Sequence, residues 1–190
     1  MDELETERLR LRHFKRDDLQ DLYEYASVPG VGEWAGWVHH ASLHESQAVL
    51  DFMFIPDKNT FAIELKSEKK VIGSIAAKTG SKTANDFPDK RVLELGYVLS
   101  PSYQHHGYMT EAVRALTEEI FDNDYADVIT ICHYKGNVRS ENVMIRAGYS
   151  YYKTVKDVYV ASLHQRTSSL CFYLTSDQYA SLKGKRNEKK

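Results

Sequence analysis

The segment between residues 92 and 121 constrains the fold more than any other part of this sequence. It contains an apolar strand pattern, Val92–Leu99, stopped by Ser100-Pro101, then a polar turn around Gly107 and a helical pattern at Thr110–Phe121. Backbone N–H groups at such a helix start point outward together, and the helix dipole adds positive potential, so the turn is suited to bind phosphate. Many strand–turn–helix units bind nothing, so the pattern alone leaves both interpretations open.

Strand and helix patterns fill the rest of the chain in a mixed order. Strands are expected at residues 8–14, 60–65, 71–77, 92–99, 128–132, 149–160 and 168–174, and helices at 17–26, 43–53, 110–121 and 139–146. Strands that first pair in hairpins and then alternate with helices predict an α/β or α+β domain around one mixed sheet. The length of 190 residues fits a single domain. We expect it to span residues 1–176, followed by a basic tail at 177–190 that is solvated and disordered from Lys183 onward.

Composition and charge exclude several classes of protein. There are 25 Lys and Arg against 27 Asp and Glu, a net charge of -2, which argues against a dedicated nucleic-acid binder. No apolar run approaches the ~20 residues that span a bilayer, and the acidic start is unlike a signal peptide. We therefore expect a cytoplasmic protein without membrane association. Cys132 and Cys171 match no metal spacing and are expected to be reduced, buried thiols.

Two motif-like patterns are weak. Residues 30–35 fit the dinucleotide pattern G-x-G-x-x-A, the only support for a nicotinamide enzyme, but they follow a helix pattern and a proline instead of a strand. His39, His40 and His44 lie close together beside Glu45, yet no Cys or further His cluster completes a set of metal ligands. Histidines at the surface of a helix start explain them better, and we expect no metal.

Two blocks in the second half of the chain together resemble a known family. Gln104-x-x-Gly107-x-Met109 looks like the acyl-CoA pyrophosphate signature Q/R-x-x-G-x-G/A of the GNAT N-acetyltransferases. Asn137-x-x-Ser140-x-x-Val143, followed by Arg146-Ala147-Gly148-Tyr149, is similar to a second element of that family. The opening at residues 6–12 is similar to the usual start of its RimJ/RimL-like branch. The resemblance covers roughly residues 6 to 176 and implies one acyl-CoA N-acyltransferase domain. In that fold, a mixed central sheet splays at the coenzyme A site and helices flank it.

The resemblance assigns the cofactor-binding residues to the strand, the turn and the second block. Backbone groups near the end of the strand would bind the pantetheine and polarise the thioester, and the turn would hold the pyrophosphate. Asn137 would contact the pantetheine or cap the following helix. Met109 replaces the last small residue of the signature. The cofactor-binding residues expected are Tyr97, Val98, Leu99, Gln104, His105, His106, Gly107, Tyr108, Met109, Thr110 and Asn137.

The catalytic residues are less clearly marked. Many members of the family protonate the leaving thiolate with a tyrosine, but Met144 stands at that register, and the branch suggests Ser140 instead. Glu94 is the leading candidate for the general base, since it lies on the central strand near the expected splay. It could equally be a strand carboxylate with a local cationic partner. The base could then be Glu33 or a chain of water molecules.

The family builds its acceptor wall between the first two helices. In this chain that segment contains Glu33, Trp34 and Trp37, which we expect to bind substrate, with His39 and His40 beside them. A loop pinned by buried aromatic side chains would show the same residues.

The function implied is transfer of an acetyl group from acetyl-CoA to a primary amine by direct attack. The acceptor would be a small molecule or a protein N-terminus, and the protein a monomer or homodimer. The alternative, suggested by the missing tyrosine, is a catalytically silent acyl-CoA-binding or sensor domain on the same fold.

Overall fold

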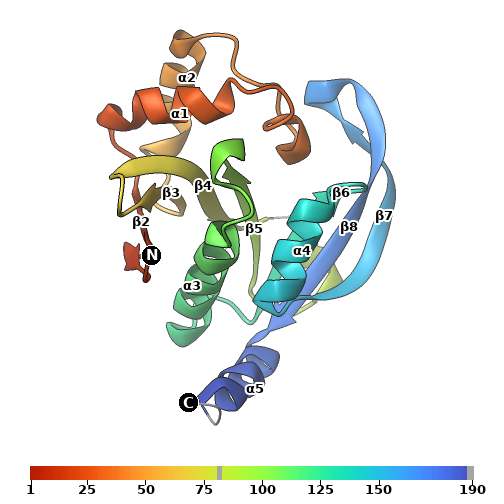
Figure 1. Ribbon diagram of the computed structural model, residues 1–190. Coiled ribbons are helices and arrows are strands. Elements are labelled where there is room, and N and C mark those ends of the chain that lie inside the picture. The colour runs from red at the N-terminus through yellow and green to blue at the C-terminus, as the bar shows by residue number, and fades with distance from the viewer. Residues whose placement is uncertain (81–82, 188–190) are drawn as a thin grey trace.

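Figure 1 shows the computed structural model, which describes residues 1–80 and 83–187. Its strands form an 8-stranded sheet in the order β1-β2-β3-β4-β5-β6-β8-β7. The strands are β1 (Leu4–Glu5), β2 (Leu9–His13), β3 (Thr60–Leu65), β4 (Lys70–Lys78), β5 (Val92–Leu99), β6 (Val128–Tyr134), β7 (Ser150–Val160) and β8 (Gln165–Thr175). The helices are α1 (Leu19–Ala26), α2 (Leu43–Val49), α3 (Tyr108–Asp122), α4 (Val138–Ala147) and α5 (Ser176–Asn187).

The sheet is mixed, as the order of the sequence patterns predicted. Strands β1 to β5 pair antiparallel with their neighbours, and so do β6, β8 and β7. Strands β5 and β6 run parallel, because helix α3 carries the chain from the end of one strand back to the start of the next. The central parallel pair therefore joins two antiparallel halves, and the polar turn of the sequence lies between β5 and α3.

Alternating side chains give the sheet two apolar faces. On β3, Phe61 and Ile63 belong to the larger core cluster, together with Val113 and Leu116 of α3, whereas Ala62 between them belongs to a second cluster. That second cluster includes side chains of α1, such as Leu22, Tyr25 and Ala26. Helices α3 and α4 thus cover one face and α1 covers the other, which leaves the ends of β5 and β6 between the two layers (Figure 1).

Helix α4 ends as its sequence predicted. Gly148 adopts φ +104°, the left-handed conformation that favours glycine at a helix C-terminus, and the backbone N–H groups that follow bond to carbonyls of the last turn. Met144 is fully buried in the larger core cluster. The residue that replaces the usual tyrosine of the family resemblance is therefore a core side chain.

The expectation of two reduced thiols is wrong, because Cys132 and Cys171 form a disulfide. Strands β6 and β8 are antiparallel neighbours, and their register places the two cysteines directly opposite each other, with Cα atoms 4.2 Å apart. The residues are 39 positions apart in the chain, so only the pairing of the strands brings them together. Cys171 is buried, as expected, but Cys132 is only partly buried.

The expectation of a disordered tail from Lys183 is wrong as far as Asn187, where helix α5 ends. Leu182 packs against the larger core cluster, and Lys183 Nζ lies 2.6 Å from a carboxylate oxygen of Asp122 on α3. The sequence suggested a solvated charge run because it is rich in lysine, but Tyr179 and Leu182 in the earlier turns of α5 dock the helix on the larger core cluster. Residues 188–190 lie outside the described part.

No helix within residues 1–80 and 83–187 is both long and apolar enough to cross a membrane.

Candidate active site

The central sheet opens between β5 and β6, as the sequence predicted. The parallel register of the two strands runs from Val92–Val128 to Leu95–Ile131 and ends there. Beyond that point β5 stays paired with β4 as far as Leu99, and β6 stays paired with β8 as far as Tyr134. Each strand keeps its outer partner, so the inner edges are free to separate and expose backbone N–H and C=O groups.

A cavity of about 1000 Å³ lies at this opening. Its walls come from the end of β5, the first turn of α3, residues 139–146 of α4, the strands β6, β7 and β8, and the loop after α1. Most of the predicted site residues line it: Trp34, Glu94, Tyr97, Val98, Leu99, Gln104, His105, Gly107, Tyr108, Met109, Thr110, Asn137 and Ser140. His106, Glu33 and Trp37 do not.

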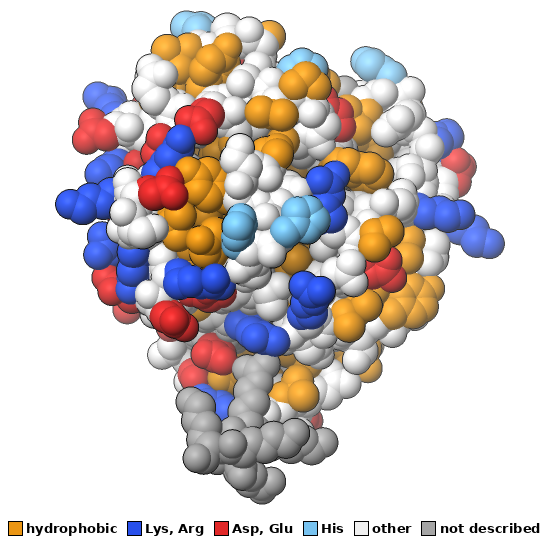
Figure 2. Space-filling view, in the orientation of Figure 1, with side chains coloured by type: hydrophobic (Ala, Val, Ile, Leu, Met, Phe, Trp, Pro, Cys, Tyr) orange, Lys and Arg blue, Asp and Glu red, His pale blue; other side chains and the backbone are white. Residues whose placement is uncertain are grey.

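The turn before α3 has the backbone shape that an anion-binding turn requires. His105 at φ +68° and Gly107 at φ +81° are both left-handed, and α3 begins immediately afterwards at Tyr108. Such a reversal brings successive N–H groups together at the start of a long helix, where the dipole is positive. Figure 2 shows histidine side chains near the centre of this face, over the starts of α3 and α4, with Lys and Arg side chains beside them.

Arg8 and Thr6 of the N-terminal segment brace the turn, in part through Glu111 of α3. Arg8 donates from Nη1 to the carbonyl of His106 at 3.0 Å, and its guanidinium lies 4.6 Å from the ring centroid of Tyr108. Glu111 in the first turn of α3 accepts from Arg8 Nε at 2.7 Å and from Thr6 Oγ1 at 2.6 Å. Burial favours the neutral form of Glu111, but these hydrogen bonds hold its pKa below the usual value.

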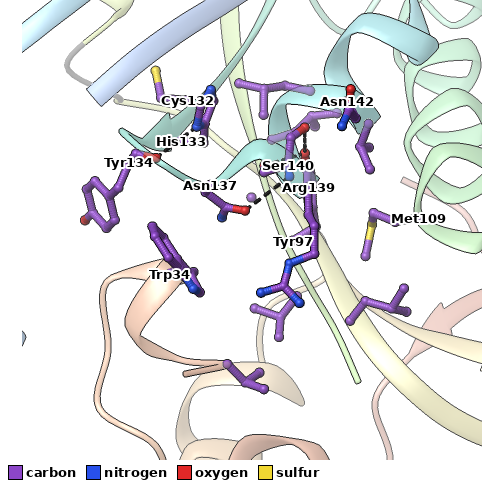
Figure 3. A pocket seen from close by; sticks show the side chains of 18 of the residues that line it. Trp34, Tyr97, Met109, Cys132, His133, Tyr134, Asn137, Arg139, Ser140 and Asn142 are labelled. Carbon is purple, nitrogen blue, oxygen red and sulfur yellow. Dashed lines mark hydrogen bonds between the residues drawn. The ribbon is translucent and has the colours of Figure 1, made fainter. Parts of the chain in front are cut away.

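The sequence motifs did not point to Arg139, a cation of the second block that contacts Gln104. Arg139 Nη1 donates to Gln104 Oε1 at 2.7 Å, and Gln104 Nε2 donates to the carbonyl of Leu99 at 3.2 Å. The side chain lines the cavity (Figure 3). The one hint in the sequence was that Arg139 stands directly before Ser140 in the second block. The family pattern does not specify the residue at that position. Only the docking of α4 beside α3 shows that it faces the turn.

Ser140 and Tyr97 form a hydroxyl pair inside the cavity. Their oxygens are 2.8 Å apart, and Tyr97 Oη also lies 3.2 Å from the carbonyl oxygen of Ser140, to which it can donate (Figure 3). Asn137 Oδ1 accepts from the Ser140 backbone N–H at 3.2 Å, so Asn137 caps α4. Burial raises the pKa of Tyr97 well above its ordinary value despite the bond to Ser140, and the phenol stays protonated.

Glu94 is the only carboxylate among the described residues that line the cavity. Thr83 Oγ1 donates to Glu94 Oε2 at 3.2 Å and lies 2.8 Å from Thr130 Oγ1, which is fully buried. Burial raises the pKa of Tyr134, and the negative charge of Glu94 raises it further, which is consistent with the two side chains facing a common space. The ion pairs of the described residues do not include Glu94, so the cationic partner considered for it is not found there.

The aromatic loop after α1 divides between cavity and core. Trp34 is 41% exposed and lines the cavity, and a Cβ built on Gly136 would lie 3.6 Å from its ring (Figure 3). Trp37 instead packs beneath Gly32, where a Cβ would overlap its ring, and its ring lies tilted against that of His40 at 5.1 Å between centroids. For Trp37, the alternative of an aromatic side chain that pins the loop describes what the structure shows.

Glu33 holds the same loop in shape. Its carboxylate accepts from the backbone N–H of Gly30 at 2.7 Å and lies 2.8 Å from His39 Nδ1. Burial opposes ionisation, but these bonds keep the pKa of Glu33 below its usual value. Residues 33–35 form a short 3₁₀ turn after α1, not the strand-to-helix turn that the dinucleotide pattern needs. His40 bonds to Ser46, and no metal-binding cluster was found among the described residues.

Comparison with known proteins shows which family the chain is similar to. Residues 8–150 match the sequence profile of the acetyltransferase (GNAT) domain. The chain belongs to the GNAT acetyltransferase family. It is therefore an acyltransferase, as the two sequence blocks indicated. The match ends at the start of β7, so the last two strands and α5 lie beyond the matched residues.

Individual GNAT relatives are distant. The uncharacterized N-acetyltransferase YnaD of Bacillus subtilis (strain 168) is 27% identical over 144 residues, which cover 75% of this chain and 79% of YnaD. A GNAT-family acetyltransferase from Bacillus anthracis superposes with a TM-score of 0.80 at 19% identity, covering 92% of this chain and 99% of the other. The microcin C7 self immunity acetyltransferase MccE, solved in complex with acetyl-CoA and AMP, superposes with a TM-score of 0.71 at 15% identity. That alignment covers 90% of this chain and 93% of MccE. These structures support the same GNAT fold.

Proposed function

We propose that this GNAT domain transfers an acetyl group from acetyl-CoA to a primary amine by direct attack. The observation that carries the proposal is the joining of two features in one cavity, the phosphate-suited turn at the start of α3 and the free strand edges between β5 and β6. A relative with the same fold is solved with acetyl-CoA bound. One cavity can therefore accommodate the long cofactor and lead its thioester toward Glu94.

The cofactor would lie along the cavity from the turn to the splay. Backbone N–H groups of residues 105–110 and the guanidinium of Arg139 would hold the pyrophosphate, since both carry positive charge at the same mouth. The backbone of Val98 and Leu99 and the amide of Asn137 would bind the pantetheine. A free backbone donor near Val98 would then stabilise the negative charge that develops on the thioester oxygen.

The acetyl transfer would take place in the part of the cavity between Glu94 and Ser140. Glu94 takes one proton from the ammonium of the acceptor, and the free amine attacks the thioester carbon, forming the C–N bond as the C–S bond breaks. The second proton of the nitrogen passes to water as the amide forms. Ser140 donates a hydrogen bond to the departing sulfur. Trp34, which is exposed and lines the same cavity as Glu94, would contact the acceptor.

A thermal-shift titration with acetyl-CoA tests the binding step. A ligand held at ~100 times its Kd adds about 2.7 kcal/mol to the free energy of unfolding, so Tm should rise with acetyl-CoA and not with NADH. No shift with acetyl-CoA contradicts the proposal. A shift without turnover across a panel of amines favours a silent acyl-CoA-binding domain, the candidate that the buried Met144 keeps open.

Replacing Ser140 by Ala tests its role at the sulfur. We expect kcat to fall about a hundredfold while the Kd for acetyl-CoA changes little. This is the lower end of the range for general acids, because an aliphatic hydroxyl is a weak proton donor. The measurement is steady-state kinetics beside a binding titration. A fall of less than about threefold would make Ser140 only a residue of the first turn of α4.

A further inference from the structure

The Tyr97–Ser140 pair can exist in two hydrogen-bonded arrangements. Each hydroxyl has one proton, and three acceptors are within reach: the two hydroxyl oxygens and the carbonyl of Ser140. In one arrangement Tyr97 donates to the carbonyl at 3.2 Å and Ser140 donates to Tyr97. In the other, Tyr97 donates to Ser140 Oγ at 2.8 Å, and the Ser140 proton is free to point into the cavity.

We infer that Tyr97 is a positioning residue for the leaving group: its hydroxyl donates to Ser140 Oγ and thereby directs the Ser140 proton to the sulfur of coenzyme A. This inference rests on the proposed function. A thiolate in the cavity favours the second arrangement, because a charged acceptor binds a hydroxyl proton more strongly than a neutral phenol oxygen does. A donor to Ser140 Oγ also polarises its O–H bond and strengthens the bond to sulfur.

Tyr97 keeps its own proton throughout. Its ring is held between the end of β5 and the first half of α4, and burial disfavours the phenolate. The proton balance closes without it: the first proton of the ammonium passes to Glu94, the second proton of the attacking nitrogen passes to water as the amide forms, and the sulfur leaves as a thiolate that Ser140 stabilises. Acting through Ser140, the phenol of Tyr97 thus helps to stabilise the leaving sulfur. Met144 cannot do this, because its side chain has no proton to donate.

The chain contains a matched control in Tyr149. Its hydroxyl also lies against another hydroxyl, Thr117 Oγ1 at 2.7 Å, and it too is buried with a raised pKa caused by desolvation. Tyr149 does not line the cavity. Tyr149→Phe and Tyr97→Phe therefore each remove one buried phenol oxygen from a hydroxyl pair, but only Tyr97→Phe alters the path to the cofactor.

The experiment compares the affinities of coenzyme A and desulfo-coenzyme A by calorimetry, from about pH 7 to 10, the range in which a thiol ionises. In the wild type, the preference for coenzyme A should increase with pH, because Ser140 stabilises the thiolate form. Tyr97→Phe should reduce that preference about tenfold at the upper end of the range and leave the Kd of desulfo-coenzyme A unchanged. Tyr149→Phe should behave as the wild type in both measurements.

Ser140→Ala provides the second variant, which keeps the tyrosine ring should Tyr97→Phe fail to fold. It should lose the same preference. Adding Tyr97→Phe to it should have no further effect, because both changes break the same chain of hydrogen bonds from Tyr97 through Ser140 to the sulfur. A wild-type preference that is constant with pH, or one that a folded Tyr97→Phe retains, overturns the inference alone. If the wild type binds neither coenzyme A nor desulfo-coenzyme A, the proposed function is overturned and this inference with it.

Discussion

Gly107→Asp is expected to abolish acetyl-CoA binding while the protein still folds. Gly107 has φ +81° at the N-terminus of α3, where the backbone N–H groups must approach the pyrophosphate closely. An aspartate adds a side chain and a negative charge at that point. A Cβ there would lie no nearer than 3.6 Å to Arg8 Nη2, so the change displaces nothing in the core. A binding titration should detect no interaction where the wild type saturates.

Gly80→Asp is the control for the backbone strain that any side chain suffers in a left-handed conformation. Gly80 has φ +71°, no atom lies within 4 Å of a Cβ built on it, and it does not line the cavity. Both variants should therefore lose similar stability, but only the change at Gly107 should eliminate binding. Micromolar affinity for coenzyme A in Gly107→Asp would contradict the position of the pyrophosphate at this turn.

Glu94→Gln is expected to lower kcat/KM about 10²–10⁴-fold at neutral pH, the range for loss of a general base. Glutamine keeps the size of the side chain and can still accept from Thr83, but it cannot take the proton of an ammonium group. The loss should shrink as pH rises, because the amine then loses its proton to solvent and no longer needs a base. A pH profile of kcat/KM for both proteins measures this.

Glu24→Gln serves as the matched change elsewhere, since Glu24 lies on α1, pairs with Lys70 and does not line the cavity. It should leave the profile unchanged. If Glu94→Gln lowers kcat/KM equally at every pH, Glu94 only positions the acceptor. Full activity would transfer the role of base to a chain of water molecules or to Glu33, although the latter is already bound to Gly30 and His39.

Local patterns predicted the elements that carry the cofactor site. Val92–Leu99 forms a strand with the predicted bounds, Gly107 precedes α3, and Gly148 ends α4. These features depend on neighbours within a few residues, through apolar periodicity, the stop at Pro101 and the left-handed conformation that glycine tolerates. They can therefore be predicted from short stretches of the sequence.

Contacts between distant segments could not be predicted in the same way. Trp34 and Trp37 are three residues apart and look alike in sequence, yet one lines the cavity and the other packs under Gly32. The Cys132–Cys171 disulfide depends on the register of β6 against β8. Both features depend on how strands, helices and loops pack against one another. The residues that meet in this packing are too far apart in the chain for a local sequence pattern to relate them.

Chain-local sterics and hydrophobic periodicity were enough to predict most of the strands and helices and the glycine turn before α3, although not β1 or α5. The family of the domain came instead from the resemblance of two sequence blocks. Which side chains meet at the splay depends on how the helices pack against the sheet. Tyr97 reaches Ser140, and Arg139 reaches Gln104, because α4 packs beside the parting edges of β5 and β6. Hydrogen bonds act over about 3 Å, so a pair such as Tyr97 and Ser140, 43 residues apart, exists only once the sheet and its helices are assembled.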